Sequence, residues 1–428
     1  MKLRAVFYCL LAAAVIIANG FCQGDTAIQQ LAPEDEHFIA QLFAMDLTPD
    51  EMEPAQKQRI FNSIQRILGI IQNNPETTPD LLKSLTAKQI ALFPQERKAY
   101  LDAASVYMKF NDMKKMHQFT IQSLSKQSQL YTGDQSRLEA TAYTMMGQYL
   151  LETKQFPRAY EALNKALILE KSIALPFFLM GNVCFQLNKF EECQNAYSIG
   201  FITDIDAAYP VDFFFYGAAL HRNGFTDKAK EIFEIGCYRY PNEQGLPLNL
   251  GYVLQQQDKL IESYLEFFRE QIIFGPQGTF NKAAQFNIDM LSDLIPRRND
   301  PREVQILNHI NRWDTLMTQE KFEQALEELQ KAVDLFADYN WTLNFFLQMN
   351  YMQLNRYSDA VEVLENMNAR NPHVVINYIE LAKAYMFQDN TDKASEYFAK
   401  ARNASPDNWK LKQMEQSFQN AFQQERDN

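Results

Sequence analysis

Four glycines at a regular spacing constrain the fold of this chain more than any other feature. Gly147 and Gly181 are 34 residues apart, and Gly217 and Gly251 are again 34 apart. Two extra residues lengthen the step between Gly181 and Gly217 to 36. A period near 34 predicts paired antiparallel helices that stack into a solenoid, because each pair buries its apolar face only against its neighbours.

Further residues recur behind the first three glycines. A small residue follows twelve positions later, a bulky apolar one four after that, and a small one three further on: Ala159, Leu163 and Ala166; Cys193, Tyr197 and Gly200; Ala229, Phe233 and Gly236. Helix axes pack only about 8–10 Å apart, so small residues are needed where two backbones approach closely. Pro241 follows the second helix of its pair, which it helps to end because it cannot continue a helix.

Aromatic residues surround these contacts: Tyr143, Phe156, Phe177, Phe190, Phe213 and Phe225. Over residues 140–276 the whole pattern resembles the tetratricopeptide repeat (TPR), which has the same small, aromatic and terminal proline positions. Cys193 departs from the alanine that the family prefers, and Tyr or Phe stands where the family has tryptophan. The resemblance implies helix pairs whose first helices line a concave binding face.

The spacing returns after a break. Ala325, Ala360 and Ala394 are 35 and 34 residues apart, with Leu329, Leu364 and Phe398 four positions behind them. Pro372 and Pro406 are also 34 apart. Before this second array, Pro296 and Pro301 flank four polar residues, which predicts the end of one helix and the start of the next. We expect a bend or a subdomain boundary there.

The expected fold is therefore an all-α, TPR-type solenoid. Its parts are an N-terminal helical region over 25–95, a first array over 96–276, an irregular helix and proline-flanked break over 277–305, a second array over 306–406 and a closing helix over 407–428. The clear repeats of the first array cover 140–173, 174–207, 210–243 and 244–276. Residues 96–130 look like a worn repeat with a turn at 110–112. Its cluster of Lys114, Lys115 and His117 is interpreted as a solvated helix face.

Residues 1–24 have the features of a secretory signal peptide. Lys2 and Arg4 precede an apolar run over 7–18, and small residues follow at positions suitable for cleavage. We therefore expect an exported protein, periplasmic or associated with the cell surface, and a bacterial origin. Two alternatives stay open: an uncleaved membrane anchor, and lipidation of Cys22, although Phe21 stands where a small residue is wanted.

Three cysteines lie beyond the leader: Cys184, Cys193 and Cys237. Cys184 and Cys193 fall on helix faces that we expect to be buried, as small core residues. A disulfide between them stays open, because an oxidising compartment permits it.

No arrangement of residues in the sequence indicates catalysis. The histidines are far apart, and glycine-rich phosphate loops, Cys-x-x-Cys pairs and nucleophile motifs are absent. The formal net charge of −12 at pH 7 argues against nucleic acid or anionic membrane as the main partner. We expect no enzyme activity, no cofactor and no metal.

The first helices of three repeats carry residues that the repeat itself does not require. By their spacing these side chains share the outward-turned face: Phe178, Asn182 and Phe185; Phe214, His221 and Arg222; Tyr252 and Gln255. Rings offer contact area, and the amide and cationic groups suit a peptide backbone or carboxylate. The alternative is that several of these aromatic side chains pack between repeats. The lysines that some TPR proteins use to clamp a terminal carboxylate are missing here.

These features predict a non-catalytic scaffold or adaptor of the cell envelope that binds a partner protein or peptide along the concave face. The second hypothesis is a small-ligand-binding or transport-accessory protein with a hydrophobic pocket between the two arrays. The oligomeric state does not follow from the sequence.

Overall fold

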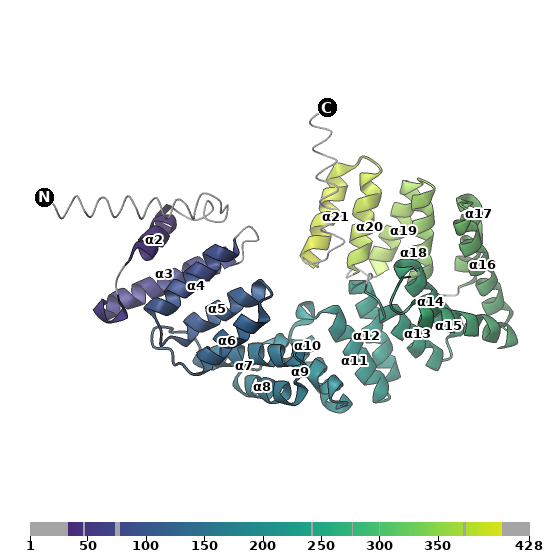
Figure 1. Cartoon of the computed structure of the whole chain (residues 1–428). Helices are drawn as coiled ribbons and strands as arrows, with labels where there is room; N and C mark the ends of the chain where they lie inside the picture. Colours follow the sequence, from purple (N-terminus) through teal and green to yellow (C-terminus); the bar gives the residue numbers. More distant parts are fainter. Residues whose placement is uncertain are drawn as a thin grey trace. The chain divides into compact units, whose positions relative to one another are not determined.

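The regular elements of the described chain are helices, as the sequence predicts. A computed structural model describes residues 33–45, 48–72, 78–240, 243–275, 277–298, 300–336, 338–370 and 374–404. Over these ranges the chain forms α-helices and short 3-10 helices, with one isolated β-bridge between Glu96 and Gln127 (Figure 1). The leader, the closing helix expected over 407–428, and Pro241, Pro276, Pro372 and Pro406 lie outside these ranges. Within them, every helix is too short or too polar to cross a membrane.

The chain divides into two compact units, residues 1–187 (unit 1) and 188–428 (unit 2). In unit 1, each helix from α3 onward packs against the helix that follows it, which is the contact pattern of a solenoid. Its elements are α2 (Pro33–Ala44), η2 (Pro49–Glu51), α3 (Pro54–Gln72), α4 (Pro79–Leu92), α5 (Arg97–Lys109), α6 (Met113–Leu124), α7 (Gln135–Glu152), α8 (Phe156–Leu169) and α9 (Ala174–Gln186).

The N-terminal helices of unit 1 begin at prolines. Pro33, Pro54 and Pro79 each occupy the first helical position, where the missing N–H costs no hydrogen bond. Along α3, the apolar residues at helical spacing are all buried: Ile60, Ile64, Leu68 and Ile71. Helices α2, α3 and α4 share one hydrophobic core, to which Val106 of α5 also contributes.

The repeated glycines touch the bulky side chain sixteen residues later. A Cβ on Gly147 would lie 2.5 Å from Cγ of Leu163. A Cβ on Gly217 would lie 2.6 Å from the ring of Phe233, and one on Gly251 would lie 2.7 Å from the ring of Phe267. All three bulky side chains are buried. A glycine is therefore required in the first helix, because a large side chain of the second helix packs directly against that position.

A left-handed residue follows the first helix of eight helix pairs in the described chain, always seven residues after the glycine position. These residues are Asn111, Lys154, Asn188, Gly224, Asp258, Glu320, Asn355 and Asp389, with φ between 55° and 83°. The next backbone N–H then reaches a carbonyl five residues back, as from Gln155 to Leu150 at 2.7 Å. This hydrogen bond satisfies a carbonyl that the helix end leaves open. The expected turn at 110–112 is one of the eight.

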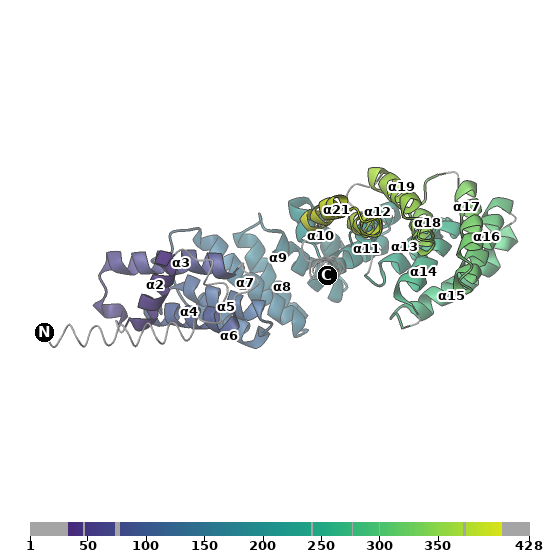
Figure 2. The ribbon, with the colours of Figure 1, turned by 90° about the horizontal axis from the view of Figure 1, so that it is seen from above.

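Unit 2 contains the rest of the first array and all of the described second array (Figure 2). Its elements are α10 (Phe190–Asp204), η3 (Ile205–Ala207), α11 (Pro210–Arg222), α12 (Thr226–Arg239), α13 (Leu246–Gln256), α14 (Leu260–Phe274), α15 (Asn281–Leu294), η4 (Ile295–Arg298), α16 (Pro301–Thr318), α17 (Phe322–Leu335), α18 (Trp341–Gln353), α19 (Tyr357–Arg370), α20 (Val375–Met386) and α21 (Thr391–Ala404). The two residues inserted after Gly181 fall in the segment where η3 forms.

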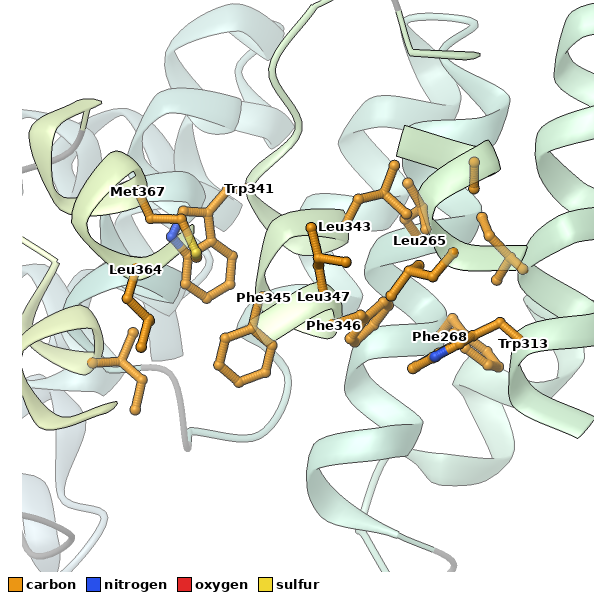
Figure 3. Close-up of a cluster of buried hydrophobic side chains, with 14 of the residues drawn as sticks. Leu265, Phe268, Trp313, Trp341, Leu343, Phe345, Phe346, Leu347, Leu364 and Met367 are labelled. Carbon is orange, nitrogen blue, oxygen red and sulfur yellow. The ribbon is translucent and has the colours of Figure 1, made fainter. Parts of the chain in front are cut away.

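In the second array the glycine position is filled differently. Counting twelve back from Ala325 and Ala360 gives Trp313 and Gln348, and both side chains are buried. Trp313 stacks on Phe346 of α18, with ring centroids 4.9 Å apart, and lies edge to face with Phe268 of α14 at 6.2 Å (Figure 3). Its indole N–H donates to Oδ1 of Asn350 at 3.0 Å. A large ring at this position joins three helices.

The second array folds back onto the first. Helix α18 packs against α14, and α20 packs against α12, so helices distant in sequence share one core. The expected helix break at Pro296–Pro301 exists, as η4 between α15 and α16. A bend or a subdomain boundary is expected there from the sequence. Helices on both sides of η4 contribute to that core, and the chain divides into its two units between Leu187 and Asn188. The helix before the break, α15, is regular.

We predict that Gly147→Ala destabilises unit 1, although alanine favours a helix over glycine by about 1 kcal/mol. The added methyl would overlap the buried side chain of Leu163, and overpacking of this kind costs about 1–3 kcal/mol. Faster hydrogen exchange in α7 and α8 is the expected readout.

Gly69→Ala is the matched control, since Gly69 is an exposed residue of α3 with no atom within 4 Å of its added Cβ. It is expected to slow exchange in α3 or leave it unchanged. Equal stabilisation by both substitutions would show that the glycine contact does not limit the helix separation.

Candidate functional site: the faces of the helical repeats

The eight residues expected to line the binding face lie on three helices. Phe178, Asn182 and Phe185 lie on α9 of unit 1. The other five lie on α11 and α13 of unit 2: Phe214, His221, Arg222, Tyr252 and Gln255. Because α11 and α13 pack against each other, these five residues occupy neighbouring helices. Whether the eight residues bind a partner stays a prediction.

Helix α9 turns out to be more deeply buried than expected. Phe178 is only 2% exposed, so its expected outward orientation is wrong. The physical reason lies in the composition of α9, which has no charged residue and is apolar on nearly all sides, as helices buried all round are. Asn182 and Phe185 are half-buried. The remaining two residues of this helix thus offer only part of their surface.

On α11, an aromatic ring, an imidazole and a guanidinium follow one face. Phe214 is half-buried and lies edge to face with Phe215, with centroids 5.4 Å apart. Arg222 is exposed, and its guanidinium lies 5.5 Å from the ring centroid of Phe190. Burial first, and then the charge of Arg222, lowers the pKa of His221. The imidazole is therefore neutral near pH 7, and its buried Nδ1 has no hydrogen-bond partner among the described residues.

On α13, Tyr252 takes part in packing between helices. Its hydroxyl accepts a hydrogen bond of 3.2 Å from Nδ2 of Asn287 in α15, and its ring lies edge to face with Phe267 of α14. Gln255, one turn further along, is half-buried. Tyr252 thus follows the alternative that the sequence left open for these aromatics, and of the five residues on the two helices only Arg222 is exposed.

A polar cleft that the sequence did not indicate lies between α16 and α17. It has a volume of about 660 Å³. Amide, hydroxyl and charged side chains dominate its lining: Asn308, Asn311, Arg312, Thr315, Leu316, Gln319, Gln324, Glu327 and Glu328. One signal could have revealed it. Arg312 stands just before the glycine position, where the other repeats bury Leu250 and Leu347.

Glu328 is the electrostatic centre of this cleft. Its carboxylate lies 2.8 Å from Nδ1 of His309 and 2.7 Å from Nζ of Lys331, and it lies 3.7 Å from the guanidinium of Arg312. Burial acts to raise the pKa of Glu328, but the hydrogen bonds from Lys331 and His309 outweigh it and lower the pKa. The Glu328 carboxylate is therefore ionised and lies among His309, Lys331 and Arg312. This arrangement gives the cleft a fixed charge and does not indicate a reaction.

Comparison with known proteins supports the repeat assignment. Residues 351–414 match the family model described as tetratricopeptide repeat. The match covers part of the second array. A search of curated proteins found no match.

Parts of the chain are similar to solved structures. YrrB, whose title describes a TPR protein with an unusual peptide-binding site, is 18% identical, with a TM-score of 0.40, and covers 47% of this chain and 97% of its own. PilF of Pseudomonas aeruginosa is 16% identical, with a TM-score of 0.43, over 54% of this chain and 98% of its own. The Cut9–Hcn1 structure is 11% identical, with a TM-score of 0.29, over 91% of this chain and 97% of that one. With scores below 0.5, these similarities support neither a shared partner nor a shared function.

The repeat of α13 and α14 holds a buried charge cluster. Arg269 is 1% exposed, and its guanidinium lies 4.4 Å from the ring centroid of Trp341 in α18. It pairs with Glu266 at 3.3 Å and donates to the carbonyl of Cys237 at 3.1 Å, and Glu266 accepts a hydrogen bond from Thr342. These contacts link α12, α14 and α18 and so hold the fold-back. Arg269 and Glu266 lie in α14, before the break, and Trp341 and Thr342 lie in α18, after it. The repeat spacing gives no indication that these residues meet.

Ser263 and Glu270, which weaken the repeat pattern in the sequence, are both accommodated by hydrogen bonds. Ser263 Oγ donates to the carbonyl of Gly251 at 2.8 Å, so the small-residue contact is preserved. Both carboxylate oxygens of Glu270 accept from the backbone N–H of Gly245, at 3.0 and 3.1 Å. Burial raises the pKa of Glu270 from 4.5 to about 7.

No three His, Cys, Asp or Glu side chains in the described part of the chain gather as a metal site would require. Cys184 and Cys193 are buried, as expected for small core residues, and Cys237 is buried as well.

We predict that Glu270→Gln changes the pH dependence of stability. The folded-state pKa of Glu270 is raised, so its protonated form is favoured by folding, and this contribution is lost as the pH rises through the window from 4.5 to about 7. Glutamine keeps an acceptor for Gly245 without the charge. The variant should therefore gain stability relative to the unsubstituted protein between pH 5 and pH 8, by on the order of 1–3 kcal/mol.

Urea unfolding of both proteins at the two pH values measures this difference. Asp212, whose pKa burial raises to about 6, is present in both and cancels. A stability difference that stays constant from pH 5 to pH 8 would contradict the prediction.

Proposed function

We propose that this protein is a non-catalytic interaction scaffold that binds a partner protein or peptide through its TPR helices. The observation that carries the proposal is the face of α11 and α13, where repeat packing leaves polar, cationic and aromatic groups partly exposed on neighbouring helices. Arg222 supplies a charge, neutral His221 supplies a donor and an acceptor, and Phe214 supplies apolar contact area. Such mixed groups suit peptide backbone and side chains rather than one small molecule.

The competing idea, a hydrophobic pocket between the two arrays, fits the structure less well. Where the arrays meet, Phe268, Trp313 and Phe346 fill the space by packing on one another (Figure 3). The cleft between α16 and α17 is lined mostly by polar and charged residues and lies within the second array. These observations favour a partner that binds on the surface.

We also propose that the protein is exported and acts in the cell envelope. The support is the leader in the sequence, with Lys2, Arg4 and the apolar run over 7–18. Intact mass measurement of the protein purified from its native cells tests this, and the expected mature chain begins after Gly20 or Gly24. A chain that keeps residues 1–24 would argue for an anchor, and added lipid mass on Cys22 would argue for a lipoprotein.

Charge reversal of one arginine tests the binding face. Arg222→Glu is expected to reduce partner capture from envelope extract by at least about tenfold, because it replaces an exposed cation of the face by an anion. Quantitative mass spectrometry of the captured proteins measures the effect.

Arg312→Glu is the matched control, since Arg312 is also exposed but lies in the cleft between α16 and α17. It should leave capture unchanged. Loss with Arg312→Glu alone would move the site to the cleft, and failure of the unsubstituted protein to retain any partner would sink the scaffold proposal.

A further inference from the structure

Three lysines of unit 1 converge on two aromatic rings. Nζ of Lys83, in α4, lies 5.6 Å from the ring centroid of Tyr107 and 5.6 Å from that of Phe110. Lys115, in α6, lies 5.0 Å from Tyr107, and Lys109, at the end of α5, lies 5.8 Å from Phe110. We name these five residues the lysine–aromatic patch. Because they come from three helices, the patch is a product of the fold.

The patch is accessible to solvent, and neighbouring side chains hold its residues in place. Lys109 and Lys115 are exposed, as is the adjacent Lys114, while the two rings are half-buried. Phe119 stacks on Tyr107 with centroids 5.3 Å apart and holds that ring in place. Asp112, which lies between the lysines in sequence, accepts the backbone N–H of Lys115 at 3.1 Å and so caps α6. The rings and the cap orient the lysines without neutralising them.

Lys83, Lys114 and Lys115 differ from the lysines of the chain that form ion pairs along their helices. Lys189, Lys230 and Lys400 each pair with a glutamate three or four residues along their helix. Within the described ranges, Lys83, Lys114 and Lys115 form no such ion pair. The chain has 53 acidic and 41 basic residues, so these three lysines without acidic partners in the described ranges form a local positive site on a negatively charged protein.

The charge balance selects the kind of partner. At physiological ionic strength the field of the patch decays over about 8 Å, so a short segment feels it alone. A long polyanion such as nucleic acid, or an extended anionic membrane, would also meet the rest of a protein with net charge −12. An acidic peptide segment is small enough to avoid that repulsion, and its apolar side chains can contact Tyr107 and Phe110.

We propose that the lysine–aromatic patch docks a short acidic segment of a partner protein through side-chain carboxylates. The inference rests on the proposed scaffold function and adds a second contact to it. The patch lies on α4, α5 and α6, whereas the proposed binding face lies on α11 and α13. The two proposals can therefore fail separately.

The test uses a fluorescent decapeptide of Asp, Glu and Phe with an acetylated N-terminus and an amidated C-terminus, so that only side chains carry charge. Fluorescence anisotropy with the full chain should show binding that weakens as salt is added. A peptide with Asn and Gln in place of Asp and Glu should bind at least about tenfold more weakly. Equal binding of both peptides overturns the proposal.

Lys83→Glu with Lys115→Glu should reduce binding of the acidic decapeptide at least tenfold. Lys154→Glu with Lys165→Glu, on other exposed lysines of unit 1, makes the same change in net charge and should reduce it less than twofold. If the first variant unfolds by circular dichroism, Lys83→Gln with Lys115→Gln replaces it. Equal losses in the two charge-reversed variants would show that only net charge matters and would reject the patch.

Two further measurements settle the kind of partner. Vesicles containing phosphatidylglycerol and a single-stranded DNA oligomer should bind more weakly than the decapeptide. Tighter binding of either, lost on substitution of Lys83 and Lys115, overturns the acidic-segment proposal in favour of that polyanion. Loss of decapeptide binding on Arg222→Glu but not on substitution of Lys83 and Lys115 would place the acidic segment on the α11–α13 face and overturn the patch.

Discussion

The distance between the two helices of a repeat depends on one contact, that of a glycine with the bulky side chain sixteen residues later. Leu163, Phe233 and Phe267 each leave no room for a Cβ at Gly147, Gly217 and Gly251. Close approach lets the turn between the helices be short, and a left-handed residue seven positions after the glycine closes it. The partly exposed face of α11 and α13 is a consequence, because tight pairs present their first helices as neighbours.

The local pattern of the sequence predicted much of the fold because that contact is local. Gly147 and Leu163 are close in sequence, so their spacing carries the geometry of the pair. The return of α18 onto α14 is different, since it joins residues such as Trp313, Phe346 and Phe268 through packing that no period encodes. The prolines at 296 and 301 correctly indicated a helix break, but a break does not say whether the core ends there. Here Arg269 of α14 pairs with Glu266 and lies over Trp341 of α18, so the core continues from one side of the break to the other.

The candidate site was less predictable, because helical periodicity gives the direction of a side chain and not the depth at which its helix lies. Phe178 and Arg222 both occupy outward-turned positions by spacing, yet one is buried and the other exposed. The difference follows from their helices: α9 has no charged residue and is buried nearly all round, whereas α11 ends in His221 and Arg222. The charge at a helix end was thus a better guide to exposure than the aromatic content of its face.

The lysine–aromatic patch shows the same principle for charge. Lys114, Lys115 and His117 are a short run in sequence, and a run alone most simply means solvation. The fold changes its composition: Lys83 joins from α4, while His117 leaves, because its ring stacks on Tyr149 and burial lowers its pKa. The patch therefore consists of lysines whose ammonium groups lie over aromatic rings, in a chain where acidic residues outnumber basic ones. A positive site on a protein of net negative charge can attract only a partner small enough to escape the repulsion of the rest, and that limit on partner size is a property of the whole chain rather than of the lysines.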